Sequence, residues 1–361
     1  MDLIVKPSST CNFRCTFCSS TYLSENPKDR VQLDEIRQFI QRFPDTQTII
    51  LNGGDPLMMP PDYYWAMIAL LDELGSEATI SFTTNLWPFY KKPQLWAPLF
   101  KHPRVGVTTS FQYGDGRRKG DGTVFTEADF IACSDAMLEH VGYRPDFIAV
   151  IDHSNAHTVL DTVRLAQRLG VECKLNHATA SGKEVVVGGI TMGNEGKLYT
   201  RGEMYRHYVE IYNAGLMEWE YNTKQVAKKL QGHATTCPTS RDCDSGIRTL
   251  QPGGGYYSCG HFGDDQENPI DFKREMAGEF FTPLQQFELD SLKQSCYVCP
   301  MFELCNGCKK TISDTKRLGL VEHHCRTMKS IAPAIIQMNG LEGILEPTPY
   351  EDESVELIFK G

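Results

Sequence analysis

The chain has 361 residues, of which 41% are apolar, and a formal net charge of −10. This length and apolar content suffice for one large domain and a smaller one, each with its own core. The negative net charge argues against a protein that binds the phosphate backbone of nucleic acids. No run of about 18 apolar residues predicts a membrane span, and the start, MDLIVKPSST, is too weakly apolar for a signal peptide. We therefore expect a cytoplasmic protein.

The first half of the chain alternates β-rich runs with amphipathic helical patterns. Strands are predicted at Leu3–Lys6, Thr48–Leu51, Thr79–Thr84, Val105–Ser110, Phe147–Ile151 and Glu172–Asn176. Helices are predicted between them at Leu33–Phe43, Tyr63–Leu74, Glu127–His140 and His157–Leu169. Repeats of this kind predict an α/β fold, a partial (β/α)6 barrel of the TIM type, with its chemistry at the strand ends.

The second half is less regular. Residues 178–200 are Gly-rich and predict a loop, whereas residues 203–230 predict helix with a break at Gly215. The cysteine-rich stretch that follows buries little apolar surface and should need metal to fold. A short helix is expected at Ser330–Met338, before an acidic end. We therefore expect a barrel over residues 1–200, a helical linker over 201–236, an auxiliary metal domain over 237–330 and a tail over 331–361.

The chain has 13 cysteines, and three of them fall in one short loop after the first predicted strand. Reduced cytosolic thiols at this density are typical of metal ligands. Cys11, Cys15 and Cys18 have C-x3-C-x2-C spacing. Three thiolates can hold three irons of a [4Fe–4S] cluster and leave the fourth iron open. A structural zinc site would need a fourth nearby ligand, and the next cysteine is Cys133.

The end of this loop, Cys15-Thr16-Phe17-Cys18, resembles the C-x-aromatic-C ending of radical S-adenosylmethionine (SAM) enzymes. The resemblance implies that the amino and carboxylate groups of SAM chelate the open iron. One electron, from a donor such as flavodoxin or ferredoxin, would then cleave SAM to a 5′-deoxyadenosyl radical. That radical abstracts hydrogen from a substrate, and the difficult chemistry belongs to the cofactor.

Other segments resemble the same family at the expected places. Asn52-Gly53-Gly54-Asp55-Pro56 resembles its GGEP motif, with Asp55 in place of the usual Glu. Thr83-Thr84-Asn85 resembles a segment near the ribose, with Leu86 where Gly is usual. The basic run at 117–119 could pair with the SAM carboxylate or form a solvated loop. The resemblance implies SAM contacts from Phe17, Asn52, Gly53, Gly54, Asp55, Pro56, Thr84, Asn85, Ser110 and Arg117.

Eight further cysteines lie between residues 237 and 325, the number that two fully ligated [4Fe–4S] clusters require. Their order resembles the SPASM extension of radical SAM peptide maturases and sulfatase-maturing enzymes. The resemblance implies a nearer auxiliary cluster on Cys237, Cys243, Cys259 and Cys308, and an outer one on Cys296, Cys299, Cys305 and Cys325. The family's core is usually C-x2-C-x5-C-x3-C, and here the last gap has two residues. Two zinc sites are the alternative. Cys133 and Cys173 are predicted to be small buried apolar residues.

The residues after Cys259 are expected to approach a substrate cleft. His261 and Asp264 are candidates for an acid or base, with packing as the alternative for the histidine. Gln112 and Tyr113 could line the same site or pack in the core.

Three classes of function compete. The first is modification of a ribosomally made precursor peptide by crosslinking, epimerisation or backbone rearrangement with excision of a residue. The second is oxidation or rearrangement of a small molecule such as an aminosugar or amino acid. The third is an iron–sulfur electron carrier, which has no use for an open iron. The eight distal cysteines favour the peptide, because small-molecule relatives often have a shorter extension. With little chain before Leu3 and after Cys325, we expect a separate small protein to recognise the leader peptide.

Overall fold

The computed structural model describes residues 1–21, 29–230, 246–279, 296, 298–299, 301, 305, 308–338, 345–347 and 357–359. Cys237 and Cys243 therefore lie outside the described residues. The chain divides into two compact units. The first comprises residues 1–148, 181–195 and 242–283, and the second comprises residues 149–180, 196–241 and 284–361. Within the described residues, no helix is both long and apolar enough to cross a membrane.

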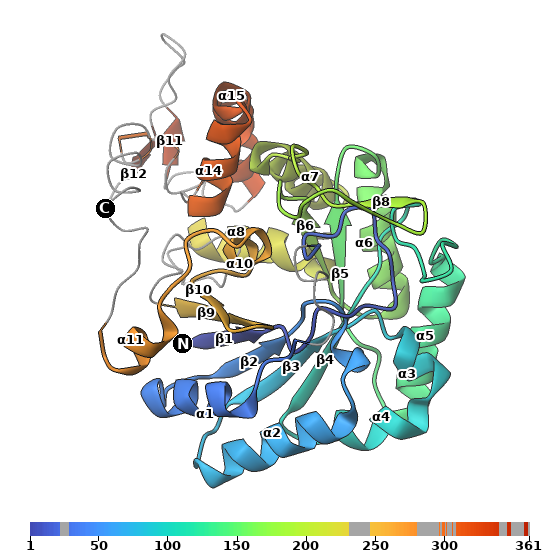
Figure 1. Cartoon of the computed structure of the whole chain (residues 1–361). Coiled ribbons are helices and arrows are strands. Elements are labelled where there is room, and N and C mark those ends of the chain that lie inside the picture. The colour runs from blue at the N-terminus through green and yellow to red at the C-terminus, as the bar shows by residue number, and fades with distance from the viewer. Residues whose placement is uncertain are drawn as a thin grey trace. The chain divides into compact units, whose positions relative to one another are not determined.

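The first unit is built on a mostly parallel sheet (Figure 1). Strands β1 (Asp2–Val5), β2 (Thr48–Leu51), β3 (Thr79–Thr83) and β4 (Val105–Ser110) pair in chain order, and the start of β5 (Phe147–Ile151) pairs with β4. On the other side of β1, β9 (Ile247–Gln251) pairs in parallel and β10 (Gly255–Tyr257) adds an antiparallel edge. Short β9 and β10, which the sequence did not predict, thus extend the predicted parallel sheet.

Helices cover the outer side of β1–β4 (Figure 1). They are α1 (Leu33–Arg42), α2 (Pro61–Glu73), α3 (Trp87–Lys91), α4 (Pro93–Phe100) and α5 (Glu127–His140), with the 3-10 turn η2 (Pro56–Met58) before α2. Every second residue of β1 and β2 is fully buried and the ones between are half-buried. One face of the sheet therefore packs on the helices, where the Tyr64 and Phe82 rings lie 4.7 Å apart.

The second unit combines the end of β5 and the neighbouring β6 (Cys173–His177) with helices. The helical elements are η3 (Ala156–Thr158), α6 (Val159–Leu169), α7 (Arg201–Asn213), η4 (Met217–Trp219), α8 (Tyr221–Leu230), α14 (Lys309–Arg317) and α15 (Val321–Met338). Gly215 has a φ of +70° and separates α7 from η4, which confirms the predicted break. Strands β11 (Leu345–Pro347) and β12 (Leu357–Phe359) pair with each other.

The six predicted strands are all present, and the α/β fold of the partial-barrel type is confirmed. The prediction of an irregular loop over 178–200 was wrong in part. Residues Val185–Val187 (β7) and Ile190–Met192 (β8) form an antiparallel hairpin. Gly188 and Gly189 have φ of +58° and +79°, and positive φ at both central residues is what a type I′ hairpin turn requires. The same glycines that indicated a loop therefore build a tight turn.

Candidate active site

The first cysteine loop directly follows β1. Cys15 and Cys18 are half-buried and Cys11 is exposed. Burial raises the pKa of Cys15, and burial together with the Cys15 thiol raises the pKa of Cys18 to about 12. These thiols have raised pKa values and would repel one another as thiolates. They therefore need a nearby cation to stay deprotonated. The loop therefore fits iron ligands, whose binding releases the thiol protons.

Two other segments hold this loop in shape. The backbone N–H groups of Arg14 and Thr16 donate to the carbonyl oxygens of Arg118 and Gly116, at 2.8 and 2.9 Å. The side chain of Asn194, just after the β7–β8 hairpin, donates to the Phe17 carbonyl at 2.8 Å. Hydrogen bonds from two other segments of the chain thus hold the cysteine loop.

Arg117 is the one buried residue of the basic run at 117–119. Its guanidinium donates to Ser110 Oγ at 2.9 Å and to Gln112 Oε1 at 2.7 Å. It also lies 5.3 Å from the centre of the Phe17 ring. The positive charge of Arg117 opposes the effect of burial on the pKa of Cys15. A fixed cation therefore faces the cysteine loop.

The other two residues of this run pair with surface acids, Arg118 with Asp115 at 3.1 Å and Lys119 with Asp129 at 3.2 Å. Tyr113 points to the same surface, because its hydroxyl donates to Glu127 at 2.7 Å. Only Arg117 of the run is therefore placed to serve the site.

The turn Asn52–Pro56 packs directly on the chain leading to the cysteines. Gly53 has a φ of +101°, and a Cβ there would lie 2.8 Å from Lys6 Cβ. A Cβ on Gly54 would overlap the carbonyl oxygen of Thr10. Both glycines are therefore required for the close approach. Among the described residues, the buried Oδ1 of Asn52 has no hydrogen-bond partner, so it fits an ammonium donor from a ligand.

Asp55 is buried and connects this turn to the end of β3. Its carboxylate accepts hydrogen bonds from the Leu57 N–H at 2.9 Å, the Thr84 hydroxyl at 2.9 Å and the Asn85 N–H at 2.8 Å. Burial raises the pKa of Asp55 to about 6. The structure therefore brings together three residues that the sequence proposed as SAM contacts, and shows that Asp55 holds the other two in place.

Asn85 and Leu86 complete the turn after β3. The Asn85 side chain donates to Asn12 Oδ1 at 2.8 Å, which ties the turn to the residue after Cys11. Leu86 has a φ of +59°, a left-handed conformation that a glycine adopts without strain. The backbone here thus keeps the shape that the usual glycine would give, although the residue is leucine.

A buried ion pair lies beneath the cysteine loop in the same unit. Lys6 Nζ pairs with Asp264 and donates to the Gly260 carbonyl at 3.3 Å. Ser20 Oγ donates to Asp264 Oδ1 at 2.8 Å. Burial alone would raise the pKa of Asp264, but the positive charge of Lys6 holds it well below its usual range. Asp264 is therefore an ionised carboxylate that links β1, the cysteine loop and α10 (Gly260–Asp265).

His261 and Asp264, the two candidates for an acid or base, differ in solvent exposure. His261 is about half-exposed, with Nδ1 3.7 Å from Asp264 Oδ2. Asp264 has both its carboxylate oxygens directed at neighbours, and its side chain is only 6% exposed. Sequence reasoning missed Lys6 and Ser20, because nothing local marks residues whose partner is 258 and 244 positions away.

Three of the described distal cysteines lie near one another, Cys296, Cys299 and Cys325. Burial is the largest cause of the raised pKa of Cys296, and the nearby Cys325 and Cys299 raise it further. Cys305 Sγ lies 3.2 Å from His324 Nε2. Cys259, in the first unit, is the N-cap residue of α10.

Cys133 and Cys173 are fully buried, as predicted for apolar packing residues. Within the described parts of the chain, no three His, Cys, Asp or Glu side chains converge as ligands of a single ion do. A [4Fe–4S] cluster does not require its ligands to converge on one ion, because each cysteine binds a different iron and the cysteine sulfurs stay apart.

The fold places the cysteine loop at the carboxyl end of β1, in a mostly parallel sheet covered by helices. Residues 5–179 match the family model of the Radical SAM superfamily. The matched part runs from the end of β1 through β6, and this part of the chain is similar to the superfamily. No match was found among curated proteins.

Solved structures share this fold. Native anSMEcpe with bound AdoMet has 14% sequence identity and a TM-score of 0.69, covering 94% of this chain and 99% of that one. Native anSMEcpe with bound AdoMet and Cp18Cys peptide has 13% identity and a TM-score of 0.65, with coverages of 94% and 99%. Streptococcus suis SuiB bound to precursor peptide SuiA has 14% identity and a TM-score of 0.52, with coverages of 78% and 65%. At these identities the likeness establishes the fold.

Proposed function

We propose that this radical SAM enzyme holds three [4Fe–4S] clusters and modifies a ribosomally made precursor peptide by abstracting a hydrogen atom from it. The observation that carries the proposal is the loop of Cys11, Cys15 and Cys18, which faces the buried cation of Arg117. The eight distal cysteines supply the ligands for two auxiliary clusters. The reaction would crosslink, epimerise or rearrange the peptide.

When bound, a cluster with one open iron supplies the electron that cleaves SAM to the 5′-deoxyadenosyl radical. The chain's own residues position the reactants. Cys11, Cys15 and Cys18 would each hold one iron. Asn52 presents an unpartnered Oδ1 to the ammonium of SAM, and Arg117 presents a fixed positive charge to its carboxylate.

Neighbouring side chains support these contacts. Asp55 fixes Thr84 and Asn85, which border the proposed ribose position. Phe17 stacks near Arg117 and shields its charge from water. These residues hold SAM in one orientation, so that cleavage places the radical at one point of the substrate.

A peptide substrate is supported by what the fold's solved examples contain. SuiB has a structure with precursor peptide SuiA, and anSMEcpe has one with Cp18Cys peptide. Both cover most of this chain. We propose the same substrate class here, with a separate small protein that recognises the leader, a flavodoxin or ferredoxin as electron donor, and a cytoplasmic location.

His261 and Asp264 take different parts in the proposal. His261 is the accessible candidate for a proton acceptor, because its ring is half-exposed. Asp264 would orient it through the carboxylate that Lys6 already holds. A proton acceptor must reach its substrate, and the buried carboxylate satisfies that condition less well than the ring.

The test uses a candidate precursor peptide encoded beside the enzyme, reconstituted protein, SAM and a reductant. We expect a mass change in the peptide with formation of 5′-deoxyadenosine. Changing Cys259 and Cys308 to Ala should leave SAM cleavage partly active and stop product formation. Cys133→Ala, at a buried cysteine without a proposed ligand role, is the matched control, and circular dichroism must show that each variant is folded.

Three results would contradict parts of this proposal. Product formation at the normal rate in the Cys259 and Cys308 variant would remove the auxiliary clusters from the reaction. Turnover of a free aminosugar without any peptide would replace the substrate class. Tight leader binding by this chain alone would remove the separate recognition protein.

A further inference from the structure

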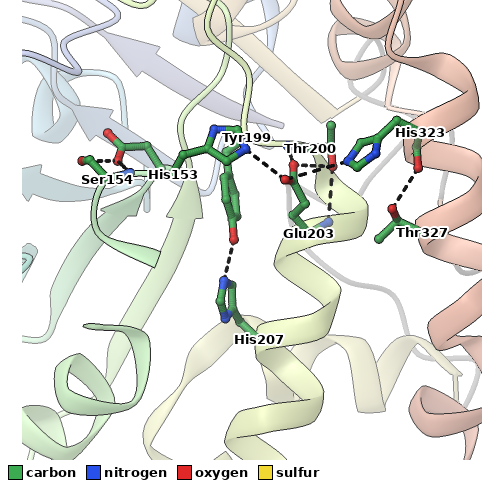
Figure 2. Close-up of polar contacts among 9 residues, drawn as sticks. His153, Ser154, Tyr199, Thr200, Glu203, His207, His323 and Thr327 are labelled. Atoms are coloured by element: carbon green, nitrogen blue, oxygen red, sulfur yellow. Dashed lines mark hydrogen bonds and ion pairs between the residues drawn. The ribbon is translucent and has the colours of Figure 1, made fainter. Parts of the chain in front are cut away.

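The first turn of α7 is fixed against α15 by one carboxylate (Figure 2). Glu203 Oε2 accepts hydrogen bonds from the backbone N–H and the hydroxyl of Thr200, both at 2.7 Å. Glu203 Oε1 lies 2.9 Å from His153 Nε2 and 3.9 Å from His323 Nε2. Glu203 therefore joins the start of α7 to the β5–η3 loop and to α15.

The two helices are also in close contact at Gly202. A Cβ on Gly202 would lie 2.9 Å from the Cβ of Thr327. Thr327 in turn donates its hydroxyl to the His323 carbonyl at 2.8 Å (Figure 2). The α7 and α15 helices thus approach closely at Gly202, where a Cβ would also lie 3.2 Å from the His324 carbonyl oxygen.

Two buried side chains at this contact point to Cys305. Arg201, beside Gly202, is 3% exposed, and its Nη1 donates to the Cys305 carbonyl at 3.3 Å. His324 is 6% exposed, and its Nε2 lies 3.2 Å from Cys305 Sγ. A guanidinium and an imidazole from different helices therefore meet at one predicted cluster ligand.

The buried positive charge of Arg201 requires anions nearby. A guanidinium is stable in a buried position only when anions compensate for the lost water. Burial acts to lower the pKa of Arg201, whereas the negative charges that Tyr205, Cys308, Cys305 and Tyr208 can carry raise it. Tyrosines are neutral near pH 7, whereas cysteines become anionic when they ligate iron. Iron-bound Cys305 and Cys308 are thus the natural counter-charge of Arg201.

We propose that Arg201 and His324 are positioning residues that raise the reduction potential of the auxiliary cluster bound through Cys305. The inference rests on the proposed function, because it requires that cluster. A nearby positive charge and a hydrogen bond to a ligand sulfur both stabilise the reduced, more negative cluster. The cluster with these two neighbours should therefore accept an electron more readily than the same cluster without them.

The experiment is an EPR-monitored redox titration of the full-length reconstituted enzyme with dithionite. Arg201→Gln removes the charge and Arg201→Lys keeps it, whereas His324→Leu removes the hydrogen bond. Arg206→Gln, at an exposed arginine on the same helix, is the matched control for the loss of a positive charge. The N-terminal cluster is the internal reference, since its ligands belong to the other compact unit.

We expect Arg201→Gln to make reduction of one auxiliary cluster at least tenfold less favourable, which is about 59 mV for a one-electron couple. His324→Leu should shift the same cluster in the same direction, and Arg201→Lys should stay closer to wild type. The auxiliary potentials of Arg206→Gln and the potential of the N-terminal cluster should stay at the wild-type values. If Arg201→Gln fails to retain iron, His324→Leu alone decides the matter.

The failures of the two proposals are distinct. Unchanged auxiliary potentials in the Arg201 and His324 variants, with about eight auxiliary irons bound, would overturn this inference and leave the proposed function intact. Wild-type protein in which the distal cysteines bind no iron would overturn the proposed function, and this inference with it.

Discussion

Asp264→Ala should destabilise the first unit strongly, because it leaves Lys6 as a buried charge without its partner. The two side chains are 3% and 6% exposed, and removing one member of a buried ion pair costs about 3–5 kcal/mol. For a unit of this size each kcal/mol lowers the melting temperature by about 2–4 °C, so a fall of roughly 6–20 °C is expected. Scanning calorimetry of the reconstituted protein measures it.

The control is Asp115→Ala, which breaks an ion pair in which the aspartate is 80% exposed and should change stability by less than about 1 kcal/mol. The double change Lys6→Met with Asp264→Leu should recover most of the loss, since an apolar pair of similar volume replaces the charges.

The pH dependence has a defined sign. The pKa of Asp264 is lowered in the folded protein, so its contribution is present above the unfolded pKa of about 3.9 and is lost as the pH falls below that value. A melting temperature of Asp264→Ala within about 2 °C of wild type would refute the structural role of the pair.

Two further predictions concern the turn after β2. Gly54→Ala places a Cβ against the Thr10 carbonyl and should weaken SAM binding at least about tenfold in equilibrium dialysis; unchanged affinity would show that the turn does not contact SAM. The pKa of Asp55 is raised by burial to about 6, above its unfolded value of about 3.9, so its contribution to stability should fall as the pH rises between those values, by up to about 1.4 kcal/mol per pH unit. Asp55→Asn should remove this slope from calorimetric melts of the iron-free protein, and an identical slope in the variant would contradict the assignment.

Local sequence patterns predicted those strands and loops that are determined by residues close together in the sequence. The strands at Thr48–Leu51, Val105–Ser110 and Phe147–Ile151 have the predicted bounds, because β-branched runs ended by turn residues leave little freedom. The cysteine loop was recognised because its ligands are close in sequence. The β7–β8 hairpin was missed because Gly188 and Gly189 signal a turn without stating which neighbours pair across it.

The supporting contacts of the site could not be predicted in the same way. Lys6 resembles any lysine at a strand end until β1 and α10 come together and bury it against Asp264. Arg201 begins an ordinary helix, and its position beside Cys305 depends on the packing of α7 on α15. Asp55 was predicted to contact SAM, whereas its hydrogen bonds to Thr84 and Asn85 follow from the neighbouring ends of β2 and β3.

The most direct test of the account is iron analysis joined to an assay for 5′-deoxyadenosine on anaerobically reconstituted protein. The wild type should bind about twelve irons and cleave SAM only when a reductant is present. Changing Cys11, Cys15 and Cys18 together to Ala should remove about a third of the iron and abolish cleavage, because only this loop leaves an iron open. Zinc in the anaerobically purified native protein, with no reductant-dependent cleavage of SAM, would contradict the account.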